Sequence, residues 1–333
     1  MLDTFKALVV RENEDGNFAR KIENKKFTDL PDNDVLVRVH YSALNFKDAL
    51  SATGHKGISR VYPHTPGVDA GGVVVKSENE KFKEGDEVVI TGHDLGMNTS
   101  GGLAEYVSVP SEWVINLPDS LSLKEAMIYG THGITASMCI YELQKQGITP
   151  ESGKILVTGS TGGVGSMAVA LLAKERYHVI AATGKMDKKD YLLGIGASEV
   201  INRSELHDES GKPLLRSRWI GAVDTVGGKT LSTVIAHTGQ HGAVCCLGLV
   251  ESDKFCTTLY PFLLRGLKLI GIDSAEKGIQ LKRYLWNQLA LEWKPKMLLE
   301  MAREVNLEDI DKEIDLILKG GQVGKVLVKC KAG

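Results

Sequence analysis

The chain has 333 residues, of which 43% are hydrophobic and 25% charged, and its formal net charge is -2. This composition is typical of a soluble globular protein, and the length predicts two domains or one large one. The near-neutral charge argues against a nucleic-acid partner, and no apolar run reaches the roughly 18 residues needed to cross a bilayer. The N-terminus lacks a signal-peptide pattern, and the odd number of cysteines favours reduced thiols, so we expect a cytoplasmic protein.

The first ~120 residues are β-rich. Short strand-like runs are separated by clusters of Gly, Pro, Asn and Asp, and they cover residues 5–10, 34–41, 72–76, 87–91 and 104–110. The pattern then changes, and either Ser120 or Ser122 can cap a helix that continues through Ile140.

The most informative segment is a glycine-dense turn at residues 159–165, which follows an apolar run at 155–158 and precedes an Ala-rich helical pattern. This order of strand, turn and helix is typical of a dinucleotide-binding unit, although Ser160 stands where the first glycine is usual. Glycines let backbone N–H groups approach a pyrophosphate, and the helix start adds unpaired N–H groups. We expect the pyrophosphate to be held by Thr161, Gly162, Gly163 and Val164.

The second strand of this unit, near residues 177–183, should end at the adenosine ribose. An NAD site places Asp or Glu there, whereas this chain has Thr183, Gly184 and Lys185. A hydroxyl and an ammonium favour a 2′-phosphate, so the sequence predicts NADPH as the cofactor. Arg203 can stack on the adenine or pair with the same phosphate.

From Lys154 onward, strand-like and helical patterns alternate. The strand-like runs are 155–158, 179–182, 199–201, 221–224, 243–247 and 267–272. Six such units predict a Rossmann-type doubly wound parallel sheet, with the loops after the strands facing the cofactor. We therefore expect Leu247, Gly248 and Ser274 among the cofactor contacts.

The C-terminal part returns to mixed structure. Helical patterns cover 280–292, 295–304 and 310–319, and the strand-like run 324–329 ends the chain. One strand cannot stand alone, so we expect it to join the N-terminal β-rich domain. The predicted division is residues 1–122 plus 295–333 for that domain, and 123–294 for the inserted nucleotide-binding domain.

Several segments together resemble the medium-chain dehydrogenase/reductase superfamily, in its quinone-oxidoreductase-like branch and closest to the acrylyl-CoA reductase group. The likeness keeps the order of motifs along nearly the whole chain. It is carried by residues 41–50 (YSALNFKDAL), 66–69 (PGVD), 101–107 (GGLAEYV), 158–165 (TGSTGGVG), 223–228 (VDTVGG) and 264–274 (LRGLKLIGIDS). The resemblance implies a GroES-like catalytic domain that carries an inserted Rossmann domain.

The resemblance also implies an enzyme without zinc. Zinc-dependent members carry a Cys and a His-Glu pair where this chain has Asn45 and Val68-Asp69, and their four structural cysteines are missing from residues 90–110. Zinc needs three or four converging Cys, His or carboxylate ligands. We therefore expect no metal.

The resemblance further implies roles for individual residues. Asn45 is expected to hold the nicotinamide ribose or the substrate carbonyl, with Tyr41 and Lys47 beside it. Arg60 and Tyr62 are expected to line the substrate entrance, while Thr131 and Lys325 are expected near the cofactor.

The chemistry implied is hydride addition from NADPH to the C=C of an α,β-unsaturated carbonyl compound, most closely an acrylyl-CoA-type thioester. An NADPH:quinone oxidoreductase, a 2-alkenal reductase and a non-catalytic NADPH-binding protein remain alternatives. We also expect a homodimer, because similar enzymes pair the edge strands of their nucleotide domains and residues 267–272 are apolar.

Overall fold

The structure is a computed structural model that describes residues 3–330. The chain forms two compact units. The first consists of Met1–Thr131, Ala275–Ala290 and Leu298–Gly333, and the second of His132–Ser274 and Leu291–Met297.

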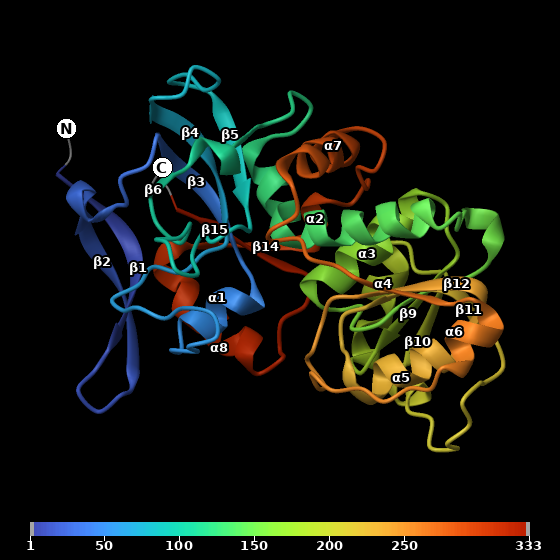
Figure 1. The fold of residues 1–333 in the computed structure, drawn as a ribbon. Helices are drawn as coiled ribbons and strands as arrows, with labels where there is room; N and C mark the ends of the chain where they lie inside the picture. The colour runs from blue at the N-terminus through green and yellow to red at the C-terminus, as the bar shows by residue number, and fades with distance from the viewer. Residues whose placement is uncertain (1–2, 331–333) are drawn as a thin grey trace. The chain divides into compact units, whose positions relative to one another are not determined.

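The second unit is built on a six-stranded parallel sheet (Figure 1). Its strand order is β10-β9-β8-β11-β12-β13, so the order reverses between β8 and β11. This is the doubly wound arrangement that the sequence predicts, and all six expected strands are present. Their bounds are β8 (Ile155–Val157), β9 (Val179–Thr183), β10 (Glu199–Asn202), β11 (Trp219–Asp224), β12 (Thr238–Cys246) and β13 (Lys268–Gly271).

Helices cover both faces of this sheet (Figure 1). Leu231, Val234 and Ile235 of α5 (Gly228–His237) pack on one face, and Phe262 of α6 (Tyr260–Arg265) joins the same cluster. The connections between β8 and β10 are α3 (Gly163–Lys174) and α4 (Lys189–Gly194). Because both faces are covered, the inner strands β8, β9 and β11 are almost wholly buried and largely apolar, as in other parallel sheets.

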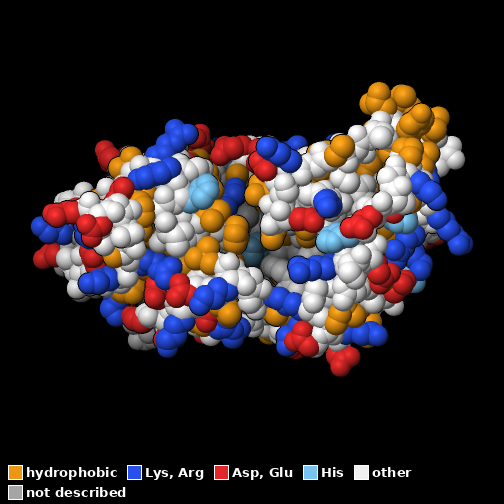
Figure 2. All heavy atoms as spheres, turned by 90° about the horizontal axis from the view of Figure 1, so that it is seen from below, with side chains coloured by type: hydrophobic (Ala, Val, Ile, Leu, Met, Phe, Trp, Pro, Cys, Tyr) orange, Lys and Arg blue, Asp and Glu red, His pale blue; other side chains and the backbone are white. Residues whose placement is uncertain are grey.

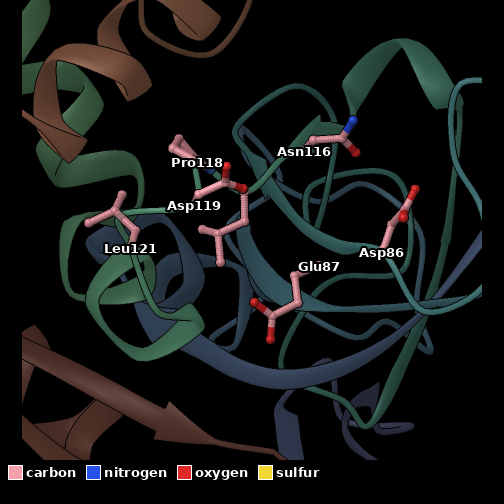
Figure 3. Close-up of a pocket in the computed structure, with 7 residues that line it drawn as sticks. Asp86, Glu87, Asn116, Pro118, Asp119 and Leu121 are labelled. Atoms are coloured by element: carbon pink, nitrogen blue, oxygen red, sulfur yellow. The ribbon is translucent and has the colours of Figure 1, made fainter.

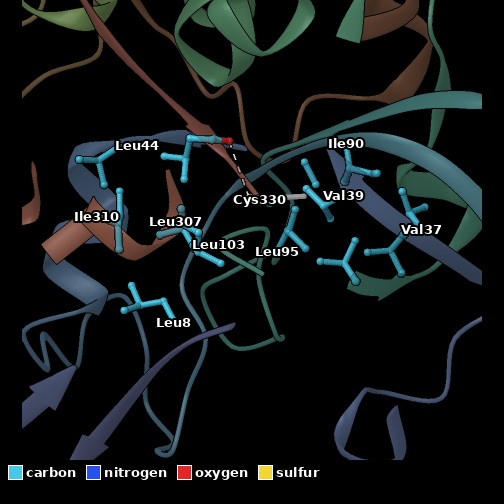
Figure 4. Packing of buried hydrophobic residues seen from close by; sticks show 14 of the residues in the cluster. Leu8, Val37, Val39, Leu44, Ile90, Leu95, Leu103, Leu307, Ile310 and Cys330 are labelled. Carbon is cyan, nitrogen blue, oxygen red and sulfur yellow. Dashed lines mark hydrogen bonds between the residues drawn. The ribbon is translucent and has the colours of Figure 1, made fainter. Parts of the chain in front are cut away.

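The first unit is β-rich, as expected. A mixed sheet has the order β14-β15-β3-β4-β5-β7, β6 pairs with β3, and β1 and β2 form a separate hairpin. Leu8, Leu44, Leu103 and Ile310 belong to its main buried cluster (Figure 4). The bounds are β1 (Thr4–Glu12), β2 (Phe18–Lys26), β3 (Val35–Leu44), β4 (Asp69–Ser77), β5 (Glu87–Thr91), β6 (Tyr106–Val109), β7 (Ile115–Asn116), β14 (Ala302–Asn306) and β15 (Lys325–Lys329).

The C-terminal strand joins the first unit, because β15 pairs antiparallel with β3, and this prediction is confirmed. The helix expected over residues 295–304 is wrong. A short turn at Leu299–Met301 leads instead into β14, which pairs in parallel with β15. The sheet edge offers β14 a full set of backbone partners, and that pairing overrides the local helical pattern.

The remaining helices are α1 (Phe46–Ser51), α2 (Leu123–Lys145), α7 (Ile279–Ala290) and α8 (Ile310–Leu318). Ser122 caps α2, because its hydroxyl accepts from Glu125 N while the Glu125 carboxylate accepts from Ser122 N. The helix bends at Gly130, whose φ of 48° lies outside the helical range. No helix within residues 3–330 has the length and apolar character needed to span a membrane.

Candidate active site

A buried polar cluster in the first unit is centred on the carboxylate of Asp69. One oxygen, Oδ1, accepts hydrogen bonds from Thr131 N at 2.8 Å and Thr131 Oγ1 at 2.7 Å. The other, Oδ2, accepts from Asn45 Nδ2 at 2.8 Å and lies 3.5 Å from Lys325 Nζ. Lys325 Nζ also donates to Asn45 Oδ1 at 3.3 Å. The structure thus brings together three of the predicted site residues around a carboxylate that the sequence interpretation did not single out.

Strand register explains why these residues meet. Leu44, the last residue of β3, is paired with Val326 of β15, so Asn45 and Lys325 lie next to each other just beyond this pair. Asp69 is the first residue of β4, and the hydroxyl of Ser42 in β3 donates to its carbonyl oxygen at 2.7 Å.

Asp48 adds a second buried carboxyl to the cluster. It accepts from Asn45 N at 2.7 Å and from Val68 N at 2.9 Å. Burial, with a further contribution from the charge of Asp69, raises the pKa of Asp48 to about 7. Burial also lowers the pKa of Lys325, although the nearby carboxylates of Asp69 and Asp48 oppose that shift.

Gly130 allows the bend of α2 to come close to this cluster. A Cβ atom at residue 130 would lie 2.6 Å from Asp69 Oδ2 and 3.2 Å from Lys325 Nζ, so a side chain there would displace the charged groups. The bend places the Thr131 N–H and hydroxyl against Asp69. Glycine is needed here both for its positive φ and for space.

Four other predicted residues lie outside the hydrogen-bonded cluster. Tyr41 is half-buried in β3, and Lys47 and Arg60 are exposed. The hydroxyl of Tyr62 donates to Ser51 O at 2.8 Å, which ties down its own loop.

In the second unit, the glycine turn forms a close-packed cradle at the carboxyl end of β8. A Cβ at residue 165 would collide with the backbone of Gly159, and one at residue 163 would collide with the His132 ring. Gly159 itself has a φ of 57°. The turn leads directly into α3, whose first residue is Gly163 and whose N-cap has no side-chain hydrogen bond. Its first N–H groups therefore point toward the space beyond the strand ends.

The end of β9 lies beside this cradle. Thr161 Oγ1 and Thr183 Oγ1 are 3.2 Å apart, and Thr183 Oγ1 accepts from Lys185 N at 3.0 Å. The side chain of Arg203 lies against Gly184, because a Cβ at residue 184 would be 2.7 Å from Arg203 Nε. Burial lowers the pKa of Lys185, with a smaller opposing effect from Asp187. Two cationic side chains and a hydroxyl thus converge at this strand end.

The ends of β8 and β11 are joined by the buried carboxyl of Asp224. It accepts from Thr158 Oγ1 at 2.7 Å and from Gly227 N at 2.8 Å, and burial raises the pKa of Asp224 to about 6. Leu247 follows β12 and donates its N–H to Asp224 O at 3.1 Å. Ser274 follows β13, and its hydroxyl accepts from Thr135 Oγ1 at 2.7 Å.

The structure also has a separate pocket of about 360 Å³ in the first unit (Figure 3). Glu87, which lines it, is paired with Val73, whereas Asp69 is paired with Thr91 at the other end of β5. The pocket is therefore remote from the Asp69 cluster. Its lining residues are Asp86, Glu87, Asn116, Leu117, Pro118, Asp119 and Leu121.

Asp48, Asp69 and Asp224 are the functional candidates that the sequence interpretation used only as parts of motifs. Each is a carboxylate at a strand or helix terminus, and Asp69 and Asp224 also lie beside glycine-containing segments, which was a usable signal. Among the residues described, no group of three or more His, Cys, Asp and Glu side chains could hold a metal ion.

The raised pKa of Asp48 predicts a pH-dependent stability. The folded protein binds this proton more tightly than the unfolded chain does, so the stabilisation is complete below an ordinary aspartate pKa of about 4. It is lost as the pH rises through about 7, the pKa in the folded state. Asp48→Asn cannot ionise and should lose less stability than the wild type between about pH 5 and about pH 8.

Urea unfolding midpoints at several pH values measure this difference. The exposed Asp15→Asn is the control and should follow the wild-type pH profile. Parallel profiles for Asp48→Asn and the wild type would contradict the assignment of a raised pKa to Asp48.

Comparison with known proteins identifies the family of the chain. Residues 31–119 match the family model described as "Alcohol dehydrogenase GroES-like domain", and residues 163–291 match "Zinc-binding dehydrogenase". A putative quinone oxidoreductase, YhfP of Bacillus subtilis, is 42% identical over 99% of this chain and 100% of its own length. The acrylyl-CoA reductase AcuI of Ruegeria pomeroyi is 38% identical over 98% and 100%, respectively.

Solved structures of related proteins also match nearly the whole chain. The YhdH oxidoreductase of Salmonella enterica, in complex with NADP, has a TM-score of 0.95 and 40% identity, and the match covers 98% of this chain and 100% of that one. Bacillus subtilis YhfP, with NAD bound, has a TM-score of 0.95 and 42% identity, with 98% and 99% covered. The chain belongs to the medium-chain dehydrogenase/reductase superfamily, with quinone-oxidoreductase-like and acrylyl-CoA reductase proteins as its close homologues.

Proposed function

We propose that this chain is an NADPH-dependent oxidoreductase that reduces the C=C of an α,β-unsaturated carbonyl compound, foremost an acrylyl-CoA-type thioester. The observation that carries the proposal is the glycine cradle beside the hydroxyl and cationic groups of Thr183, Lys185 and Arg203. Acrylyl-CoA reductases are among the relatives that match nearly the whole chain.

The residues present fit this cofactor. The cradle permits close backbone approach to a pyrophosphate at Thr161–Val164, and the α3 terminus favours negative charge. At the end of β9, Lys185 and Arg203 would hold a 2′-phosphate, and there is no carboxylate among residues 183–185 to repel it. The NADP-bound Salmonella structure supports this choice, while the NAD-bound Bacillus structure makes NADH the necessary comparison.

When bound, NADPH supplies a hydride to the β-carbon of the substrate. The hydrogens of Asn45 Nδ2 are already directed at Asp69, Asp48 and Ala43 O, so this amide has no spare donor for a substrate carbonyl. Its Oδ1 accepts from Lys325 and retains a lone pair. Of the two roles expected for Asn45, we therefore favour accepting a hydroxyl of the nicotinamide ribose.

A CoA ester needs cations near the substrate entrance for its phosphate groups. Arg60 and Lys47 are exposed and suit that role. Lys56 is a poorer candidate, because its ammonium pairs with Glu12 at 2.8 Å and lies over the Phe18 and Tyr62 rings. A quinone or 2-alkenal substrate would need no such cations, and the name of the Bacillus relative favours the quinone alternative.

The function is tested by following the absorbance of the reduced nicotinamide with acrylyl-CoA, a free 2-alkenal and 1,4-benzoquinone, each with NADPH and with NADH. Preference for acrylyl-CoA with NADPH is the expected result. Turnover of the quinone or the alkenal alone would show that the proposed substrate class is wrong. A lack of NADPH oxidation with all three acceptors would contradict the proposed enzymatic function.

Lys185→Ala and Arg203→Ala should each weaken NADPH binding by roughly tenfold and leave NADH binding nearly unchanged, because each removes a charge-assisted bond to the 2′-phosphate. Fluorescence titration of both cofactors measures the effect. Lys174→Ala removes the same charge at the far end of α3 and should bind both cofactors like the wild type. Equal losses for NADPH and NADH would contradict the assignment.

We also propose a homodimer formed through the second unit. In the order of the sheet, β13 is an edge strand, and α6 beside it exposes Leu263 and Leu264 by 74% and 60%. Figure 2 shows a group of hydrophobic side chains projecting from the surface at the upper right. Pairing of two β13 strands would cover such an edge.

We also propose a cytoplasmic location for the protein. The five free cysteines support it, because disulfides are rare in that compartment.

Leu263→Asp should convert the dimer to a monomer at micromolar concentration, because it places a carboxylate in the proposed interface. Sedimentation velocity measures the change. Leu291→Asp is the matched control on another surface of the second unit, where Leu291 is 65% exposed. A wild type that sediments as a monomer would rule out the dimer.

A further inference from the structure

Glu251 connects the loop after β12 to the segment after β11. Its Oε2 accepts a hydrogen bond from Thr230 N at 2.9 Å, and its Oε1 lies 3.3 Å from His207 Nε2. Its own N–H donates to Val226 O at 2.9 Å. The Glu251 side chain is 27% exposed, so the carboxylate is held against these partners and is partly shielded from water.

The two segments are packed closely because glycines lie on both sides. A Cβ at residue 228 would be 2.8 Å from Glu251 Cγ, and one at residue 227 would be 2.6 Å from Ser252 O. A Cβ at Gly248 would collide with the Thr225 carbonyl. A backbone bridge between Gly227 and Ser252 adds to the contact. The loop at residues 247–252 is therefore docked on the start of α5.

The carboxylate of Glu251 caps the N-terminus of α5, although Glu251 lies in the loop after β12 and outside this helix. Thr230 is the third residue of α5, where backbone N–H groups have no partner within the helix. The N-cap residue, Gly227, has no side chain to provide one. A carboxylate at this terminus also interacts favourably with the helix dipole.

The docked loop begins with Leu247 and Gly248, which we propose as contacts on the nicotinamide side of the cofactor. We infer that Glu251 is a positioning residue that fixes this loop for hydride transfer; the inference rests on the proposed function. Glu251 acts through the backbone of the loop and touches neither cofactor nor substrate. Its removal should disturb the nicotinamide end of the site and leave the 2′-phosphate end at Lys185 and Arg203 intact.

The test compares Glu251→Ala, Glu251→Gln and the wild type. Three quantities are measured: the rate of a single turnover of bound NADPH at saturating acceptor, the Kd of NADPH, and the Kd of adenosine 2′,5′-bisphosphate, which reaches only the adenine end. Asp253→Asn removes a charge directly after this loop and is the matched control.

Glu251→Ala should slow hydride transfer about tenfold, since displacement of a reacting group by ~1 Å has effects of this order or larger. It should weaken NADPH binding and leave adenosine 2′,5′-bisphosphate binding unchanged. Glu251→Gln keeps an acceptor for Thr230 N and should recover much of the rate, while Asp253→Asn should resemble the wild type.

Two results would overturn the inference. One is a wild-type turnover rate in Glu251→Ala, and the other is a parallel loss of NADPH and adenosine 2′,5′-bisphosphate binding, which indicates general destabilisation of the unit. If the wild type fails to oxidise NADPH with every acceptor tested, the proposed function is refuted instead. In that case only the binding measurements test the positioning role. Glu251→Ala should then raise the Kd of NADPH and leave the Kd of adenosine 2′,5′-bisphosphate unchanged.

Discussion

The buried carboxylate of Asp69 is the interaction on which the first unit depends. It accepts bonds from Asn45, before α1, and from Thr131, at the bend of α2, and it pairs with Lys325 at the start of β15. These groups are far apart in the sequence, and Asn45, Asp69 and Lys325 are buried. Removing one partner of such a buried network typically costs about 3–5 kcal/mol, because the remaining charge is left without compensation. The positions of Asn45, Thr131 and Lys325 relative to one another therefore depend on Asp69.

Close backbone packing plays the corresponding part in the second unit. Gly159 and Gly165 let the turn after β8 fold back on itself, and Asp224 fastens the ends of β8 and β11. The order of the sheet reverses between these two strands, and parallel sheets bind ligands at such a point. The proposed cofactor site thus depends on glycines, which permit close backbone contacts, as well as on the side chain of Asp224.

The parts of this fold that could be predicted from the sequence are those with a local pattern. The six parallel strands and the glycine turn are each marked by a short apolar run and its flanking residues. The strand β2, with the sequence FARKIENKK, was missed because its charged residues obscure any alternation. The strand β14 was mistaken for a helix because its pairing with β15 is a tertiary effect.

The same distinction applies to the site. Thr183 and Lys185 were predicted from the fixed spacing of the dinucleotide-binding unit, and Arg203 was added as a further positive charge. The central position of Asp69 and the contact of Glu251 with Thr230 depend on register and loop docking between distant segments, and no local pattern records them.

The long separation of Lys325 from Asp69 along the chain has a consequence for synthesis on the ribosome. Both segments of the second unit, His132–Ser274 and Leu291–Met297, precede β15 in the chain, and domains generally fold as units during synthesis. Until β15 is made, the carboxyls of Asp48 and Asp69 lack the ammonium that the finished fold places among them. Closure of the first unit around Asp69 therefore has to wait until β15 has been synthesised.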